Sequence, residues 1–290
     1  MYATFQFQEL IDQALMEDIG TGDLSTRIFP EDLTSLAKLY AKQDGIVAGL
    51  ALVEHVFQRV DQRIQVHKLV RDGDEVKVGE VVIELDGPLS TILQGERTAL
   101  NFLQHLSGIA TATKRAVDQV TGFSTCIVDT RKTLPGWRAL QKYAVRVGGG
   151  HNHRFGLYDA VMLKDNHLTA VGGLTEAVQR VRAVIGHMVK IEVECETIEQ
   201  VEDAVACSVD VIMLDNMGID EMREAVLYID HRAIVEASGG IQEDQLRQVA
   251  ETGVDLISIG ALTHSVKALD FSLDLGEIKA TTRANWERGL

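Results

Sequence analysis

Residues 126–167 read CIVDTRKTLPGWRALQKYAVRVGGGHNHRFGLYDAVMLKDNH, and the rest of the chain is organised around this stretch. Two short apolar runs, CIV at 126–128 and AVML at 160–163, each stop at a polar cluster, DTRK or KDNH. Strands that end in this way place their polar residues at one rim of a sheet. The cations that we assign to the rim are Arg131, Lys132, Arg154 and Lys164. Four cations at one rim predict a ligand rich in negative charge.

The same pattern repeats to the end of the ISIGAL segment near residue 262. Nearly continuous apolar runs alternate with amphipathic segments; the runs are STCIVDTRK, DAVMLKDNH, VKIEVECE, VDVIMLDN, RAIVEASGG and VDLISIGAL. Such an alternation predicts parallel strands buried on both faces and joined by right-handed crossovers. Because six units are too few for a complete eight-stranded barrel, we expect an open, incomplete TIM-like α/β barrel. An open doubly wound sheet is the alternative.

The earlier part of the chain predicts a separate scaffold. Residues 35–93 are β-rich and broken by Asp-Gly and Gly turns, while 5–16 and 95–120 have helical spacing. An alternating run, FSLDL at 271–275, could return to pair with this part. We therefore predict an α/β sandwich domain from 1–106 with 267–290, and a catalytic barrel domain from 107–266.

The ends of the later strands carry further chemistry. Glu194 and Asp215 could hold Mg²⁺ or stabilise a developing cation; buried ion pairs with Lys132 or Lys164 are the structural alternative and are compatible with that function. The last two strands end in glycine turns that expose backbone N–H groups, as a phosphate site requires. Those turns contain Ser238, Gly239, Gly240, Gly260 and Ala261.

Histidines and one helical arginine complete the candidates. His151, His153 and His167 suggest a metal site, but the HNH run at 151–153 lies in a glycine-rich loop and the acidic partners are distant in the sequence, which favours hydrogen bonding to substrate or loop instead. Arg97 lies near the start of a predicted helix, where a solvated arginine is an ordinary finding. Its role is not decided by its position alone.

Composition limits the class of protein. The chain of 290 residues has a formal charge of −15, which argues against general binding to nucleic acid. Three cysteines, Cys126, Cys195 and Cys207, match no zinc spacing and indicate reduced thiols. No signal-peptide pattern or membrane-spanning run is visible, so we expect a cytoplasmic protein.

Taken together, these motifs resemble the quinolinate phosphoribosyltransferase family. The likeness is carried by the 126–167 stretch and extends through GDLST, GERTALNFLQHLSGIATAT, IEVECET, IMLDN, EASGGI and ISIGALTHS. It implies the type II phosphoribosyltransferase fold, which combines an α/β sandwich with an open barrel. It also implies a decarboxylating pentosyltransferase of pyridine nucleotide (NAD) biosynthesis, which converts quinolinate and phosphoribosyl pyrophosphate to nicotinate mononucleotide, pyrophosphate and CO₂ with Mg²⁺.

The resemblance also implies roles for individual residues. Lys132, Glu194 and Asp215 would be catalytic, with Mg²⁺ held by Glu194 and Asp215, mainly through the pyrophosphate. Arg97 would reach the site from the partner subunit of a homodimer, which could assemble into a hexamer. The other substrate-binding residues would be Thr130, Arg131, His153, Arg154, Lys164 and the two glycine turns, 238–240 and 260–261.

Two alternative functions remain open from the sequence. The chain could be a relative of the same fold that acts on another acid, such as the molybdenum-transport-associated relatives. It could also be a non-catalytic phosphosugar-binding protein. The intact TRK, HNHR and LKDNH motifs argue against the first, and the retention of both Glu194 and Asp215 argues against the second.

Overall fold

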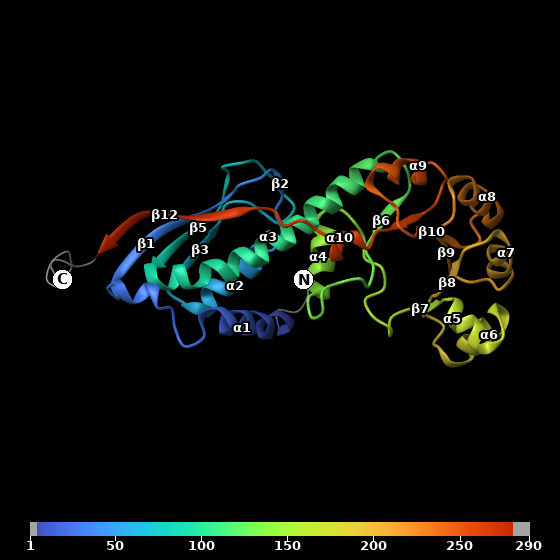
Figure 1. The fold of residues 1–290 in the computed structure, drawn as a ribbon, viewed down its shortest axis with the longest axis horizontal. Helices are drawn as coiled ribbons and strands as arrows, with labels where there is room; N and C mark the ends of the chain where they lie inside the picture. The colour runs from blue at the N-terminus through green and yellow to red at the C-terminus, as the bar shows by residue number, and fades with distance from the viewer. Residues whose placement is uncertain (1–4, 281–290) are drawn as a thin grey trace. The chain divides into compact units, whose positions relative to one another are not determined.

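A computed structural model describes residues 5–280, which form two compact units (Figure 1). Within the described residues, the first unit runs to Thr111 and adds Ala139–Gly148 and the segment from Val266. The second unit consists of Ala112–Arg138 and Gly149–Ser265. Among the described helices, none is long and apolar enough to cross a membrane.

The first unit is built on an antiparallel sheet in the order β12-β1-β5-β3. Strand β1 (Leu33–Ala41) buries alternate residues, the period expected of a sheet with one covered face. The remaining strands are β3 (Gln65–Lys68), β5 (Val81–Pro88), β12 (Phe271–Ala280) and a small pair, β2 (Gly45–Ile46) with β4 (Glu75–Val76). The C-terminal segment does return, because β12 pairs with β1.

The helices of this unit lie along one side of the sheet, as Figure 1 shows for α1, α2 and the first part of α3. The buried apolar side chains of these helices include Phe57 of α2 and Phe102 and Leu103 of α3. The helical elements are α1 (Phe5–Ile19), η1 (Ser25–Ile28), α2 (Leu50–Val60), the long α3 (Leu89–Gln119) and α4 (Arg138–Val147).

The second unit is a parallel sheet of six strands in the order β6-β11-β10-β9-β8-β7. Strand β6, the first of this unit, lies beside β11, the last, as in a barrel. Strands β6 and β7, at the two edges of the sheet, are not paired in the described part of the chain. The open, incomplete barrel is confirmed, and the doubly wound alternative is wrong. The strands are β6 (Cys126–Val128), β7 (Val161–Leu163), β8 (Ile191–Cys195), β9 (Val211–Asp215), β10 (Ile234–Ser238) and β11 (Leu256–Ser258).

Crossover helices separate these strands, as the alternating pattern predicts. Helix α7 begins with a capping box in which the Thr197 hydroxyl accepts from the backbone N–H of Gln200, so the helix has a defined start soon after β8. The helices are α5 (Asp165–Val171), α6 (Leu174–Val184), α7 (Ile198–Ala206), α8 (Ile219–Ile229), η2 (Glu243–Gln245), α9 (Leu246–Ala250) and α10 (Ala261–His264).

The two units differ from the predicted domain boundaries at 107–111 and 139–148. Residues 107–111 group with the first unit, where the Ser107 hydroxyl accepts from the backbone N–H of Ala48 at 3.0 Å. Helix α4 also groups there, and its Tyr143 hydroxyl donates to Asp72. No helix is predicted for α4 from the sequence, and the spacing of its apolar residues does not show which core they join.

Candidate active site

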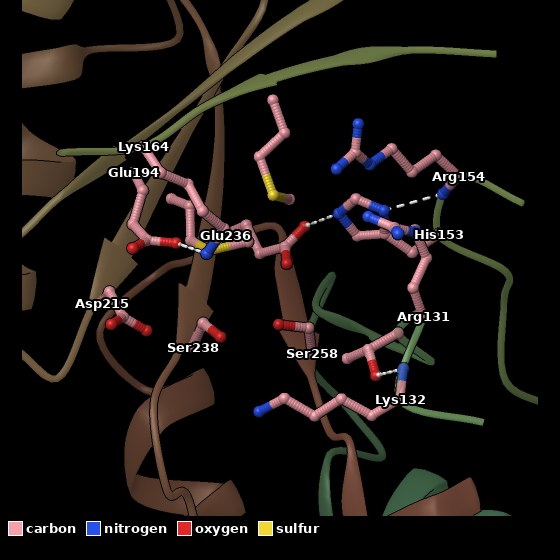
Figure 2. A pocket seen from close by; sticks show the side chains of 13 residues that line it. Arg131, Lys132, His153, Arg154, Lys164, Glu194, Asp215, Glu236, Ser238 and Ser258 are labelled. Carbon is pink, nitrogen blue, oxygen red and sulfur yellow. Dashed lines mark hydrogen bonds and ion pairs between the residues drawn. The ribbon is translucent and has the colours of Figure 1, made fainter. Parts of the chain in front are cut away.

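A single cavity of about 370 Å³ lies at the carboxyl ends of the barrel strands (Figure 2). Parallel strands bring their carboxyl ends to one rim, so residues far apart in the sequence converge there. Every strand of the sheet, or the loop that follows it, contributes to the lining. The lining residues are Thr130, Arg131, Lys132, His153, Arg154, Met162, Lys164, Glu194, Met213, Asp215, Glu236, Ser238 and Ser258.

The loop after β6 supplies Arg131 and Lys132 and is held from two sides. The Thr130 hydroxyl accepts from the Lys132 backbone N–H at 3.0 Å, and the Thr263 hydroxyl donates to the Lys132 carbonyl at 2.7 Å. Arg138 donates to the Thr133 hydroxyl at 3.0 Å and to the Phe155 carbonyl at 3.0 Å. These bonds fix the backbone that carries the two cations, so little ordering is needed when an anion binds.

The loop that follows the Gly-rich turn is anchored by a buried carboxylate. Asp129 accepts from the Asn152 side chain at 2.6 Å and from the His153 backbone N–H at 2.9 Å. Arg154 donates to the Ala160 carbonyl at 2.9 Å, while burial and then the charge of Arg131 lower the pKa of Arg154. Two close guanidinium groups in a half-buried cavity favour an anionic ligand.

The opposite side of the cavity holds two carboxylates and a lysine. Lys164 forms an ion pair with Glu194, whose side chain is mostly buried. Burial, followed by the charge of Glu194, raises the pKa of Asp215. The Asn216 side chain donates to Asp215 at 2.8 Å and orients it. Figure 2 shows Lys164, Glu194 and Asp215 on one side, facing Arg131, His153 and Arg154 on the other.

Glu194 and Asp215 are the two carboxylates predicted to hold a divalent metal, and both line the cavity. Carboxylate oxygens are the ligands that Mg²⁺ prefers, together with phosphate oxygens. The raised pKa of Asp215 reflects a site where adding a positive charge would relieve repulsion between the two carboxylates. A metal would compete there with Lys164 for Glu194.

A third cluster lies on the cavity wall between these two sides. His153 Nε2 lies 3.1 Å from a carboxylate oxygen of Glu192 and 3.5 Å from one of Glu236. Their ligand atoms lie within 4.8 Å of one another. Both glutamates are buried, and burial, then Glu192, raises the pKa of Glu236 to about 7.

Comparison with known proteins identifies the family. The family model for the N-terminal domain of quinolinate phosphoribosyl transferase matches residues 23–107, and the one for its C-terminal domain matches residues 109–274. This chain belongs to the quinolinate phosphoribosyltransferase family.

Relatives within the family are similar over almost their whole length. The probable nicotinate-nucleotide pyrophosphorylase [carboxylating] of Bacillus subtilis (strain 168) is 48% identical over 272 residues, which cover 93% of each chain. That of Synechocystis is 43% identical over 91% of each chain. The crystal structure of NadC from Streptococcus pyogenes, 40% identical, superposes with a TM-score of 0.92 and covers 96% of this chain and 98% of its own.

Most of the predicted site residues of this family member lie together. Thr130, Arg131, Lys132, His153, Arg154, Lys164, Glu194, Asp215 and Ser238 all line the cavity. Gly239 and Gly240 instead line a neighbouring hollow of about 300 Å³, together with Asn216 and Gly218. Gly260 and Ala261 line neither, although Gly260 lies close to the Lys132 side chain.

Arg97 is exposed on α3 in the first unit and is not among the described residues that line the cavity. Sequence reasoning in turn missed four residues of the lining, Met162, Met213, Glu236 and Ser258. All four lie two residues before a predicted site residue, so strand alternation is the signal that could have found them.

Proposed function

We propose that this chain transfers the phosphoribosyl group of phosphoribosyl pyrophosphate to the ring nitrogen of quinolinate. Pyrophosphate and CO₂ leave, and nicotinate mononucleotide is formed. The observation that carries the proposal is that guanidinium groups line one side of a cavity whose other side holds two carboxylates and a lysine. The family provides independent support, because the relatives named above are nicotinate-nucleotide pyrophosphorylases.

The charges suit the two substrates. Quinolinate carries two carboxylates on one planar ring, and Arg131 and Arg154 offer planar guanidinium donors that can bind carboxylates in a bidentate manner. Lys132 and Lys164 act as point charges for phosphate oxygens. We assign the 5-phosphate to Ser238 and to the backbone N–H groups of the turns at 239–240 and 260–261.

Glu194 and Asp215 stabilise charge that develops on the ribose. As the bond from the anomeric carbon to pyrophosphate breaks, positive charge develops on the ribose. Fixed carboxylates close to that charge stabilise the transition state more than the ground state. The pyridine nitrogen then attacks the anomeric carbon, and no covalent intermediate with the enzyme is needed. Lys132 neutralises charge on the departing pyrophosphate.

We further propose that Mg²⁺ assists this step. Glu194 and Asp215 are the residues that would hold it, in company with pyrophosphate oxygens. When bound, the ion supplies neutralisation of the negative charge on the leaving group. The residues of the chain retain their own roles, which are to bind, to orient and to stabilise the ribosyl cation.

The proposal extends to assembly and location. We expect a homodimer in the cytoplasm, with Arg97 contributed to the site of the partner subunit. Its exposure on α3 leaves the guanidinium accessible to another chain. Assembly of dimers into a hexamer is compatible with this arrangement.

A direct assay tests the reaction. Purified protein is incubated with quinolinate labelled in its 2-carboxylate, phosphoribosyl pyrophosphate and Mg²⁺, and the release of CO₂ and pyrophosphate is measured. We expect equal amounts of both products. Turnover of a different acid with no turnover of quinolinate would favour a relative of altered specificity, and binding without turnover would favour a phosphosugar-binding protein.

Asp215→Asn tests the role of the acidic side. We expect kcat to fall by about 10²–10³-fold because the fixed negative charge near the ribose is lost, with quinolinate affinity changed by no more than about threefold. Steady-state kinetics and quinolinate titration measure the two effects. Asp220→Asn is the control, since Asp220 is an exposed residue of α8 paired with Arg223. A loss confined to quinolinate affinity would contradict the assignment.

A further inference from the structure

The cluster of His153, Glu192 and Glu236 has no part in the steps above. We propose that Glu236 is a neutral carboxylic acid that protonates the pyridine carbon from which CO₂ has departed. This inference rests on the proposed function and assigns a further catalytic residue to it.

Glu236 occupies a position suited to acting on a ligand. It lies on β10, two residues before Ser238, and therefore on the same face of the strand. Its side chain is 1% exposed yet lines the cavity. One oxygen faces His153, while the other, Oε1, is buried with no hydrogen-bond partner among the described residues. Figure 2 shows its carboxyl group between the two charged sides of the cavity.

The hydrogen bonds of His153 fix where its proton lies. The backbone N–H of Arg154 donates to His153 Nδ1 at 2.7 Å, so Nδ1 is an acceptor and the ring proton is assigned to Nε2. Nε2 faces Glu192 at 3.1 Å and Glu236 at 3.5 Å. The single ring N–H of His153 therefore faces both buried carboxyl groups, Glu192 and Glu236.

Two carboxylates this close do not both ionise in a buried site. Glu236 is the carboxyl group that receives less from the ring N–H, because its oxygen lies 3.5 Å from His153 Nε2 while that of Glu192 lies at 3.1 Å. Burial and Glu192 together raise the pKa of Glu236 to about 7. The proton of the pair therefore lies on Glu236, whose O–H is free to be donated.

The same hydrogen bonds argue against a metal at this cluster. A metal ion on His153 Nε2 would require the proton on Nδ1, where it would oppose the N–H of Arg154. The nearby cations Arg131 and Arg154 would also repel it. The three residues are arranged to hold a proton rather than a cation.

The chemistry needs such a proton. After ribosyl transfer, the ring nitrogen is cationic, and the bond from C2 to its carboxylate breaks to give CO₂ and an electron pair on C2. That pair forms a C2–H bond with the proton of Glu236, which becomes a carboxylate. The carboxylate then recovers a proton from water, because ionisation beside Glu192 is unfavourable. No oxidant or further reactant is required.

Glu236→Gln separates the two halves of the reaction. Glutamine keeps the shape and neutral charge of the protonated acid but cannot give up a proton. In a single turnover, with excess enzyme, pyrophosphate release should stay within about threefold of the wild-type rate. Release of CO₂ should fall by about 10²-fold, because an unprotonated carbanion recaptures CO₂. The dicarboxylate mononucleotide should accumulate and be detected by mass spectrometry.

Glu192→Gln gives a second, independent readout. The titratable groups that face Glu236 are Glu192 from β8 and His153, with the Ser258 hydroxyl from β11 beside them. Without Glu192, the pKa of Glu236 should fall below its value of about 7, so CO₂ release at pH 7.5 should be slower than in the wild type and should recover at pH 6. Pyrophosphate release should not follow this pattern. A pH profile identical to that of the wild type would overturn the proposal.

The controls distinguish failure of the proposed function from failure of the role of Glu236. Glu202→Gln, an exposed glutamate of α7, should release both products at the wild-type rate. Failure of the wild type itself to release pyrophosphate from the two substrates would refute the proposed function. Wild-type release of both products, with undiminished CO₂ release by Glu236→Gln, would refute only the role of Glu236.

Discussion

Glu192 and Glu236 have the same side chain and lie two strands apart in one sheet, but their surroundings differ. The difference arises from partners: Glu192 is closer to His153 and interacts with Arg154, while Glu236 has an unpaired buried oxygen. Alternation along β8 and β10 predicts that both point inward. It does not predict their charges, which depend on neighbours from other strands.

The raised pKa of Glu236 predicts a pH-dependent stability. Its pKa rises from the ordinary value of 4.5 to about 7 in the folded chain, so the folded state binds more protons between these values. The free energy of unfolding should therefore fall as pH rises through this window and level off above it, by on the order of 3 kcal/mol. Below about pH 4.5 the contribution is fully present.

Urea unfolding at pH 5, 6, 7 and 8 checks this prediction. Other titrating groups contribute to both proteins, so the quantity to follow is the wild-type free energy of unfolding minus that of Glu236→Gln. It should decrease with pH, because glutamine does not titrate. A difference that stays constant or increases from pH 5 to 8 would show that Glu236 is ionised in the folded chain.

At the scale of elements, the apolar runs form the strands, and the polar residues at their ends line the edge of the sheet that holds the cavity. All six predicted runs become β6–β11, because an apolar run bounded by charged residues has one stable place in a parallel sheet. The residues that end each run, such as Lys164 and Asp215, could thus be assigned to a common site from the sequence. Residues deeper in the strands, such as Met213 and Glu236, resemble ordinary core positions.

Turn geometry is less visible in a sequence. Gly239 has φ +95°, and a Cβ added there would lie 2.4 Å from the Asn216 side-chain oxygen and 2.6 Å from its backbone nitrogen. Asn216 in turn donates its backbone N–H to the Ser238 carbonyl at 3.1 Å. The loops after β9 and β10 are therefore fitted to each other. A sequence shows the two glycines but not the residue that approaches them.

Gly239→Ala should consequently disturb Asp215 as well as the turn. The methyl group would displace Asn216, which orients Asp215, and the backbone would be strained. We expect kcat/KM for phosphoribosyl pyrophosphate to fall by more than about tenfold and stability to fall by about 1–3 kcal/mol. Gly240→Ala is the matched control, because its φ is +61° and nothing lies within 4 Å of an added Cβ.

Kinetics and urea unfolding of the two variants measure the difference. Gly240→Ala carries only the cost of a left-handed backbone, about 1 kcal/mol, and should leave Asn216 and Asp215 in place. Equal losses in both variants would mean that backbone strain alone, rather than contact with Asn216, accounts for the glycine at 239.

At the scale of the whole molecule, the barrel unit contains the cavity, and the sandwich unit contains one predicted site residue, Arg97. The open barrel follows from the count of strand–helix units in the sequence. The grouping of α4 with the first unit does not, because it depends on individual partners such as Asp72 for Tyr143. Neither spacing nor composition shows which subunit Arg97 serves.

Mixed dimers decide that question. Arg97→Ala and Lys132→Ala should each abolish most turnover alone. If Arg97 acts in the site of the partner subunit, a mixed dimer has one site with both substitutions and one intact site. Random mixing of equal amounts of the two variants should then restore about a quarter of the wild-type sites. Mixtures that stay inactive after subunit exchange, shown by differently tagged chains, would place Arg97 in the site of its own subunit.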